Sequence, residues 1–294
     1  TYAPVIDWST LRLLLNLTLH EGWKTKQVDC ISAFLHAPLV EDTFAELPPG
    51  GWKKANPGKV MKLKKTLYGD KRAPQMWFNH LKTSLEARGW KQSEFDPCLF
   101  LGNDVLFTVY CDGCIFFSKT DEAIQDAFNS LIVEVPGHPN GHAFKMKIEG
   151  ELCNYLVVAL NRNTSETLDM SQYHLTKRII AATGLEDANP QPTPVVKPLG
   201  KEINSGPCQE QWSMRSVVGM LQYLANNTRC EIAYAVNNVA RHCNNPMRAH
   251  EMAIKRIVRY LKGSLYVDAN GKERVRGMFL STDSLHKNHP RQKL

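Results

Sequence analysis

The segment VLFTVYCDGCIFFS, residues 105–118, decides the fold of this chain. Its two halves, VLFTVY at 105–110 and CIFFS at 114–118, are rich in the β-branched and aromatic residues that favour strands. Cys111-Asp112-Gly113 stands between them, and an Asp-Gly pair is a strong signal for a tight hairpin turn, which needs positive φ. We therefore predict a β-hairpin with Asp112 at or beside its tip.

Helix and strand patterns alternate around this hairpin and predict an α+β fold. Further strands are expected at 24–30 and 143–160, and helices at 9–21, from Pro74 to near Gly89, from about Glu122, at 171–184, and near 213–226, 231–242 and 246–262. Residues 41–60, rich in Pro, Gly and Lys, are expected to form a loop. The Pro-rich segment Asn189–Pro198 is interpreted as a linker at a domain boundary, and 294 residues agree with about two domains.

Composition excludes several classes of protein. The chain is 43% hydrophobic and 22% charged, which excludes wholesale disorder. Its longest apolar runs fall far short of the roughly 18 residues that a membrane span needs, and no signal peptide opens it, so we expect an intracellular protein. The eight cysteines are scattered over the whole length, which excludes a small disulfide scaffold and favours a reducing compartment.

The charge distribution is more informative than the total. Lys and Arg number 36 against 29 Asp and Glu, which gives a net charge of +7. The excess gathers in two blocks: residues 52–91 hold eleven basic and two acidic residues, and residues 213–294 hold fourteen and five. Such blocks are typical of proteins that bind a polyanion such as nucleic acid, although solubility alone is an equally good interpretation.

Several motifs, in order along the chain, resemble those of copia-type retrotransposon reverse transcriptases. QVDCISAFLHAPL at 27–39 resembles the first catalytic motif, KLKKTLYGDKRAPQMW at 62–77 the second, and DPCLF at 96–100 the approach to the third. SQY at 171–173, GMLQYL at 219–224 and KRIVRYLKG at 255–263 match later landmarks. Each motif is moderately specific, and their shared order over nearly the whole chain makes the resemblance strong.

The resemblance implies a right-hand polymerase palm with partial fingers over residues 1–195, thumb and connection helices over 196–265, and a truncated start of a ribonuclease H-like domain over 266–294. It implies an RNA-directed DNA polymerase that uses two Mg²⁺ ions, a template-primer of RNA or DNA, and deoxynucleoside triphosphates. It places the protein in a cytoplasmic particle or the nucleus. Primer specificity and oligomeric state stay open.

Roles are carried over by position. Asp29 and Asp112 are expected to be the catalytic, metal-binding carboxylates, with the carbonyl of Cys30 beside them. Nucleotide contacts are expected from Phe34, Tyr68, Gly69 and Lys71. Nucleic-acid contacts are expected from Lys64, Lys65, Arg72, Lys255, Arg256, Arg259 and Lys262, and Asp283 matches the first acid of ribonuclease H. Without the resemblance, a core position on an apolar helix face would be the better interpretation of Phe34, and Lys71 alone cannot be distinguished from part of a solvated basic loop.

The chain also departs from the family pattern. The family hairpin reads Tyr-Val-Asp-Asp, whereas this chain reads Tyr110-Cys111-Asp112-Gly113, so the second aspartate is missing. Asp70 stands where the family has Leu. We therefore expect a decayed or truncated copy whose polymerase activity is lost while its fold survives.

Three alternatives remain open at this point. The first is a catalytically dead palm that binds nucleic acid through the two basic blocks. The second is a redox or metal role for Cys111 and Cys114, which is disfavoured because a hairpin turn supplies no helix dipole to lower a thiol pKa. The third is an unstable product without a function.

Overall fold

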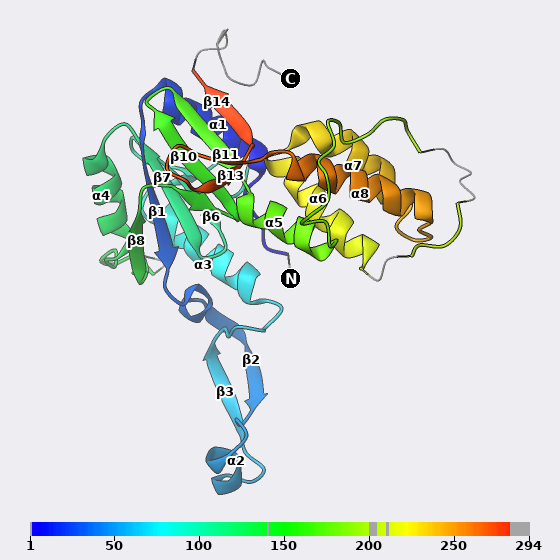
Figure 1. The fold of residues 1–294 in the computed structure, drawn as a ribbon. Coiled ribbons are helices and arrows are strands. Elements are labelled where there is room, and N and C mark those ends of the chain that lie inside the picture. The colour runs from blue at the N-terminus through cyan, green and yellow to red at the C-terminus, as the bar shows by residue number, and fades with distance from the viewer. Residues whose placement is uncertain (1, 140, 200–204, 210–211, 283–294) are drawn as a thin grey trace. The chain divides into compact units, whose positions relative to one another are not determined.

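The computed structural model describes residues 2–139, 141–199, 205–209 and 212–282 (Figure 1). The predicted ribonuclease H residue Asp283 lies outside the described residues. The contacts divide the chain into two compact units, Thr1–Leu152 and Cys153–Leu294, called here the first and the second unit. The sequence had suggested a boundary at 189–198, and the assignment of palm, thumb and ribonuclease H regions stays a prediction.

The first unit is built on a six-stranded sheet with the order β4-β5-β6-β7-β1-β8, and β2 pairs with β3 apart from it. In chain order the elements are α1 (Trp8–His20), β1 (Lys24–Cys30), η1 (Ala33–His36), β2 (Pro38–Glu46), α2 (Gly51–Ala55), β3 (Val60–Lys65), α3 (Ala73–Glu86), β4 (Lys91–Gln92), β5 (Leu99–Leu101), β6 (Val105–Tyr110), β7 (Gly113–Ser118), α4 (Asp121–Leu131) and β8 (Met146–Gly150).

Strand β7 forms the centre of this sheet. Cys114, Ile115, Phe116 and Phe117 are all fully buried, although successive side chains of a strand point to opposite faces. Both faces of the sheet are therefore covered. Helix α4 packs against β1, β6 and β7, and the Thr120 hydroxyl caps its first turn by accepting from the amide of Ala123.

The predicted hairpin over 105–118 is confirmed, but its turn differs from the expected one. Tyr110 pairs with Gly113, so the two-residue loop is Cys111-Asp112. The residue with positive φ is Cys111, at 58°, and Gly113 is not in the left-handed region. The expectation that Gly113 supplies the permissive turn conformation is therefore wrong, and its backbone is one that any residue can adopt.

The expectation of a loop over 41–60 is also wrong in part. β2 continues to Glu46, the short helix α2 covers Gly51–Ala55, and β3 begins at Val60. Together β2, α2 and β3 form an arm that extends from the body of the first unit (Figure 1). Almost none of the arm is buried, so an apolar pattern could not have indicated its strands.

The second unit combines a sheet of order β14-β11-β10-β9 and a β12–β13 ribbon with a helical core. In chain order the elements are β9 (Asn154–Tyr155), β10 (Val158–Thr164), β11 (Thr167–Ser171), α5 (Tyr173–Ala182), α6 (Met214–Asn227), η2 (Cys230–Ile232), α7 (Ala233–Ala240), α8 (Arg248–Lys262), β12 (Leu265–Val267), β13 (Glu273–Val275) and β14 (Met278–Ser281).

Apolar faces of α5, α6, α7 and α8 make the core of the second unit, with Ile179, Leu221, Val236 and Ile257 among its buried members. The three helices predicted after residue 212 are thus confirmed, the first shifted by one residue and the other two slightly shorter than expected, and α5 joins them rather than the first unit. No helix in the described part of the chain is both long and apolar enough to cross a membrane.

Candidate active site

The two predicted catalytic carboxylates lie at the same end of the sheet, Asp29 on β1 and Asp112 in the turn that leads into the neighbouring strand β7. β1 and β7 are antiparallel, and Asp29 near the end of β1 stands opposite Gly113, the residue after Asp112. The amide of Cys30 donates to the carbonyl of Asp112 at 2.9 Å, which ties the hairpin turn to β1. Two residues 83 positions apart in the sequence are thus brought side by side by strand pairing.

The electrostatics agree with this proximity. Burial raises the pKa of the Asp29 carboxyl, the negative charges of Asp112 and Glu149 raise it further, and Lys147 partly opposes them. Glu149 itself accepts from the side-chain amide of Gln27 at 2.7 Å. A negative field therefore covers this end of the sheet, and a bound cation would relieve it. Glu149 and Lys147 carried no sequence signal, because only the β1–β8 pairing brings them near Asp29.

The donor set fits a hard cation held by few protein ligands. Within the described residues, no group of three or more His, Cys, Asp or Glu side chains could hold a metal ion. Asp29 and Asp112 supply carboxylate oxygens, and Cys30 can add only a main-chain oxygen because its thiol is buried 3.9 Å from that of Cys114. Mg²⁺ commonly takes one or two protein carboxylates and completes its shell with water and substrate phosphates.

A buried tryptophan that was not among the predicted site residues supports the hairpin turn. Trp77 on α3 is 1% exposed, and its indole N–H donates to the carbonyl of Cys111 at 2.7 Å. The ring also meets Phe144 edge-on, with 5.5 Å between centroids. Trp77 therefore fixes the residue that precedes Asp112. In the sequence, the helical spacing of Trp77 indicated only a core position. Its place at the end of the second motif was the one signal of a role at the site.

Of the residues predicted to contact a nucleotide, Tyr68 lies near these carboxylates and Phe34 packs against Tyr68. The rings of Phe34 and Tyr68 lie 4.9 Å apart at 58°, and the Thr66 hydroxyl donates to the carbonyl of Phe34. Partial desolvation raises the pKa of the Tyr68 hydroxyl, and Asp112, Cys111 and Asp29 raise it further, so Tyr68 shares the field of the carboxylates. Gly69 has φ of 97°, a conformation that glycine adopts without strain.

The basic residues predicted near the nucleotide differ in their surroundings. Lys64 and Lys65 on β3 and Lys71 are exposed. Arg72 is instead enclosed by acceptors: its guanidinium reaches Glu41 at 3.0 Å, the Thr43 hydroxyl at 3.0 Å and Asp70 at 3.5 Å. The backbone amide of Arg72 also donates to Asp70 and, with its guanidinium, lowers the pKa of that carboxyl. Much of the charge of Arg72 is thus compensated within the chain.

The four basic residues predicted on the last helix also have partners within the second unit. On α8, Arg259 donates to the carbonyl of Asn189 at 2.6 Å, and Lys262 donates to that of Ala188 at 2.8 Å. Arg256 reaches the Thr193 hydroxyl at 2.9 Å, and Lys255 forms an ion pair with buried Glu251 at 3.1 Å. These contacts attach residues 188–193, which include the first part of the predicted linker Asn189–Pro198, to the face of α8.

The geometry gives the cysteine alternative no support. Burial raises the pKa of the Cys111 thiol, whereas a reactive thiol needs a lowered one. Cys114 is fully buried, and its contact with the Cys30 thiol and its burial both raise its pKa. The partner of Cys114 is therefore Cys30 on β1 rather than Cys111.

Comparison with known proteins identifies the family. A family model described as reverse transcriptase (RNA-dependent DNA polymerase) matches residues 1–197. The chain is 31% identical over 269 residues to the retrovirus-related Pol polyprotein from transposon RE1 of Arabidopsis thaliana. The matched region covers 90% of this chain and 18% of that protein. The chain is 29% identical over 276 residues to the corresponding polyprotein from transposon TNT 1-94 of Nicotiana tabacum, with coverage of 90% and 20%.

A shorter relative, the putative transposon Ty5-1 protein of Saccharomyces cerevisiae, is 25% identical over 237 residues and is covered over 75% of its length. The chain spans about a fifth of the length of the two plant polyproteins. The family match covers more than half of the chain and includes Asp29 and Asp112. The chain therefore belongs to the reverse transcriptase family, as a reverse transcriptase domain of copia-type retrotransposon Pol polyproteins.

Proposed function

We propose that this chain carries the palm and partial fingers of a template-directed DNA polymerase in residues 1–195, thumb and connection helices in 196–265, and the beginning of a ribonuclease H-like domain in 266–294. The observation that carries the proposal is the juxtaposition of Asp29 and the hairpin residue Asp112 through β1–β7 pairing. The ancestral substrates are an RNA or DNA template-primer and deoxynucleoside triphosphates, and the site belongs to a cytoplasmic particle or the nucleus.

In the ancestral reaction the primer 3′-oxygen attacks the α-phosphorus of the nucleotide, and the bond from that phosphorus to the pyrophosphate oxygen breaks. Two Mg²⁺ ions, when bound, activate the attacking hydroxyl and stabilise the leaving pyrophosphate. Asp29, Asp112 and the Cys30 carbonyl would hold them. Phe34 would pack against the sugar, where its bulk disfavours a 2′-hydroxyl. Tyr68, Gly69 and Lys71 would line the nucleotide, with Lys64, Lys65 and Arg72 on the template side.

The missing second carboxylate makes this copy inactive in our proposal, so the chain itself binds template-primer without extending it. Steric hindrance does not explain why position 113 lacks an aspartate. A Cβ at Gly113 would meet only the Tyr110 carbonyl oxygen, at 3.7 Å, and the φ of Gly113 permits any residue. Gly113→Asp therefore fits the hairpin as it stands, which makes it a direct test of the proposal.

The test is primer extension on poly-rA with oligo-dT at several Mg²⁺ concentrations. We expect extension by the Gly113→Asp variant and none by the parent or by Gly113→Asn, which has the same size without the charge. Adding Asp29→Asn to the Gly113→Asp chain should abolish extension. Extension by the parent would show that two carboxylates suffice and that our expectation of inactivity is wrong.

If no variant extends the primer, the polymerase proposal fails for this chain. The second candidate function, a nucleic-acid-binding palm whose catalysis a carboxylate at position 113 does not restore, is then decided by binding of the same duplex. It is favoured by the intact hairpin geometry around Gly113 and by the exposed Lys64 and Lys65. Binding that weakens steeply with added salt would support it, because released counterions drive contacts with phosphates. Absence of binding would exclude it.

A further inference from the structure

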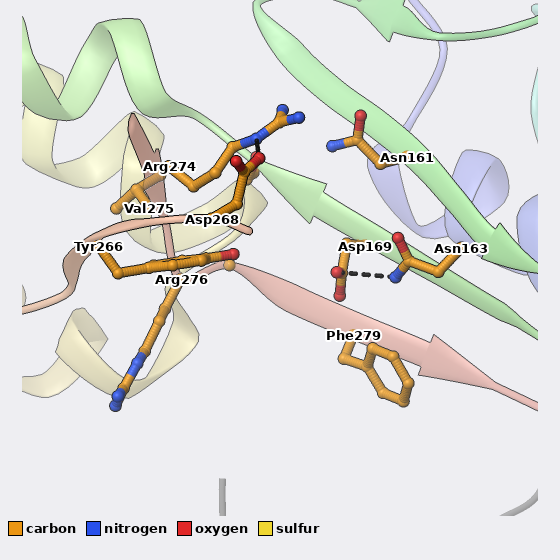
Figure 2. Close-up of a pocket in the computed structure, with 11 residues that line it drawn as sticks. Asn161, Asn163, Asp169, Tyr266, Asp268, Arg274, Val275, Arg276 and Phe279 are labelled. Atoms are coloured by element: carbon orange, nitrogen blue, oxygen red, sulfur yellow. Dashed lines mark hydrogen bonds and ion pairs between the residues drawn. The ribbon is translucent and has the colours of Figure 1, made fainter. Parts of the chain in front are cut away.

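A cavity of about 780 Å³ lies within the second unit, between one face of its four-stranded sheet and the β12–β13 ribbon (Figure 2). Its walls come from β10, β11 and β14 on one side and from Tyr266, Asp268 and Arg274 on the other. None of these residues belongs to the candidate active site, which is formed entirely by the first unit. A cavity of this volume is large enough for a ligand of nucleotide size.

The sheet face that lines the cavity is polar, whereas its opposite face is core. Across the three strands, Asn161 stands opposite Asp169, and Asp169 stands opposite Phe279, which makes one continuous row. The neighbouring positions Leu160 and Met170 are buried on the other face. The strand register itself therefore presents a row of amide, carboxylate and aromatic ring to the cavity.

The opposite wall is fixed by an ion pair of its own. Asp268 accepts from Arg274 at 2.9 Å and from the amides of Asn270 and Lys272, so its charge is compensated and the ribbon turn is held in place. Tyr266 pairs with Arg274 across the ribbon and is 47% exposed. The ring of Tyr266 lines the cavity, and its hydroxyl group is directed toward Asp169 (Figure 2).

Several polar groups on these walls retain free hydrogen-bonding capacity. Asn163 donates to one carboxylate oxygen of Asp169 at 2.8 Å, and no other described residue hydrogen-bonds to the Asp169 carboxylate. Among the described residues, the side-chain amide of Asn161 and the guanidinium of Arg276 form no hydrogen bond with another side chain. In Figure 2 Arg276 extends away from Asp169, so the free cation and the free carboxylate oxygen lie at different ends of the lining.

We propose that this cavity binds an unpaired guanine nucleotide of a single-stranded nucleic acid. Tyr266, 47% exposed, offers a ring face on which a base can stack. A carboxylate only accepts hydrogen bonds, and guanine presents two adjacent N–H donors on its Watson–Crick edge, which suit Asp169. Adenine and cytosine each place an acceptor beside a donor there, so they fit less well. Arg276, remote from Asp169, suits the phosphate.

The site goes beyond the proposed polymerase function and does not depend on it. The test is fluorescence anisotropy of labelled short single strands of dT with one central dG, dA or dC, measured in EDTA so that no metal takes part. Binding of the dT background reports the basic surfaces of the chain. The excess affinity for the strand containing dG reports the cavity.

We expect the dG strand to bind most tightly. Asp169→Asn should remove that preference, and Asp187→Asn should not, because Asp187 is an exposed acid of the same unit away from the cavity. Tyr266→Leu should weaken binding of the dG strand by about 5- to 150-fold, the usual range for loss of one stacked base, whereas Tyr266→Phe should retain most of the affinity. Asp29→Asn should leave the preference for dG unchanged, whatever it does to binding of the dT background, which separates this site from the candidate active site.

Two results would overturn the proposal. One is an unchanged dG preference in Asp169→Asn protein whose circular dichroism and melting temperature match the parent. The other is equal affinity of the parent for the dG, dA and dC strands. Failure of primer extension in the Gly113→Asp variant would leave this proposal untouched, because no step of the binding test requires catalysis.

Discussion

Trp77 provides the sharpest test of how the fold holds the proposed catalytic turn. Its indole N–H donates to the carbonyl of Cys111 at 2.7 Å from an almost completely buried ring. Trp77→Phe keeps an aromatic ring in the same place but removes the donor. Because Cys111 directly precedes Asp112 and has φ of 58°, we expect the turn to loosen when this hydrogen bond is lost.

The magnitude follows from the chemistry of the lost bond. A partly buried carbonyl left without its donor costs about 1–2 kcal/mol. Trp77→Phe also loses ring volume, so the hydrogen-bond term needs a matched control. Trp90→Phe is that control, because Trp90 is 7% exposed, packs edge-on against Phe107 at 5.9 Å, and in the described chain its N–H forms no hydrogen bond. Both variants replace tryptophan by phenylalanine, so the stability lost through the smaller ring is similar in the two.

The assay is equilibrium unfolding in urea, combined with hydrogen exchange at the amide of Cys30. That amide donates to the Asp112 carbonyl at 2.9 Å, so its exchange reports opening of the turn. We expect Trp77→Phe to lose about 1–2 kcal/mol more stability than Trp90→Phe. We expect exchange at Cys30 to accelerate about 5- to 30-fold in Trp77→Phe alone.

Equal stability losses in the two variants would refute the reasoning, since the hydrogen bond would then contribute nothing measurable. Unchanged exchange at Cys30 in Trp77→Phe would refute the link from Trp77 to the turn even if the stability difference appeared. The two readouts therefore separate a general packing role for Trp77 from the positioning of Asp112.

Three further predictions concern charge and packing. Asp29→Asn should raise the free energy of unfolding at pH 7, because burial and the charges of Asp112 and Glu149 raise the pKa of Asp29 and disfavour its ionised form in the folded state. Urea unfolding should show this gain shrinking as the pH falls toward 3.8, where the carboxyl is protonated in the unfolded chain too; a loss of stability at pH 7 would contradict it. Burial lowers the pKa of His80 to about 4, and His142 and His36 add to this, so His80 should contribute stability that is full above pH 6.5 and lost as the pH falls toward 4. His80→Gln should flatten the pH dependence of the urea midpoint in that window, and an unchanged slope would count against the assignment. Gly277→Ala should destabilise the second unit by about 1–3 kcal/mol or more, because its Cβ would lie 1.9 Å from the Met170 carbonyl oxygen. Limited proteolysis should show this, whereas Gly219→Ala in α6, which meets nothing within 4 Å, should be neutral or stabilising.

The sequence predicted the elements whose side chains carry a clear period. β1 was expected at 24–30 and has those bounds, and the paired strands of the hairpin follow from their β-branched and aromatic residues. Asp112 lies in the turn as expected, but the expected three-residue loop Cys111-Asp112-Gly113 is one residue longer than the observed one, because Asp-Gly is the most permissive pair locally. Strand pairing overrode that local preference: Tyr110 pairs with Gly113, which leaves Cys111-Asp112 as the loop. Local chemistry thus predicted that a turn exists, and tertiary pairing chose its residues.

What could not be predicted depends on groups that a sequence does not display. The sequence predicted that Arg259 and Lys262 belong to a basic, nucleic-acid-binding face. In the structure they donate to the main-chain carbonyls of Asn189 and Ala188. Every residue has a carbonyl, so no residue type could indicate these acceptors. The row from Asn161 to Phe279 was missed for a similar reason, since it exists only through the register of three strands.

The hairpin shows that the fold and the chemistry of this site are separable. The turn is held by two main-chain carbonyls, that of Cys111 bound by Trp77 and that of Asp112 bound by the Cys30 amide, and neither bond involves a side chain at position 113. Burial and then the charge of Asp112 raise the pKa of Asp29, so a further carboxylate at 113 would add repulsion to the metal-free protein. An aspartate there would cost stability until a cation bound, and glycine removes that cost without disturbing the bonds that hold the turn. The same two bonds are the reason to expect that restoring the carboxylate can restore the site.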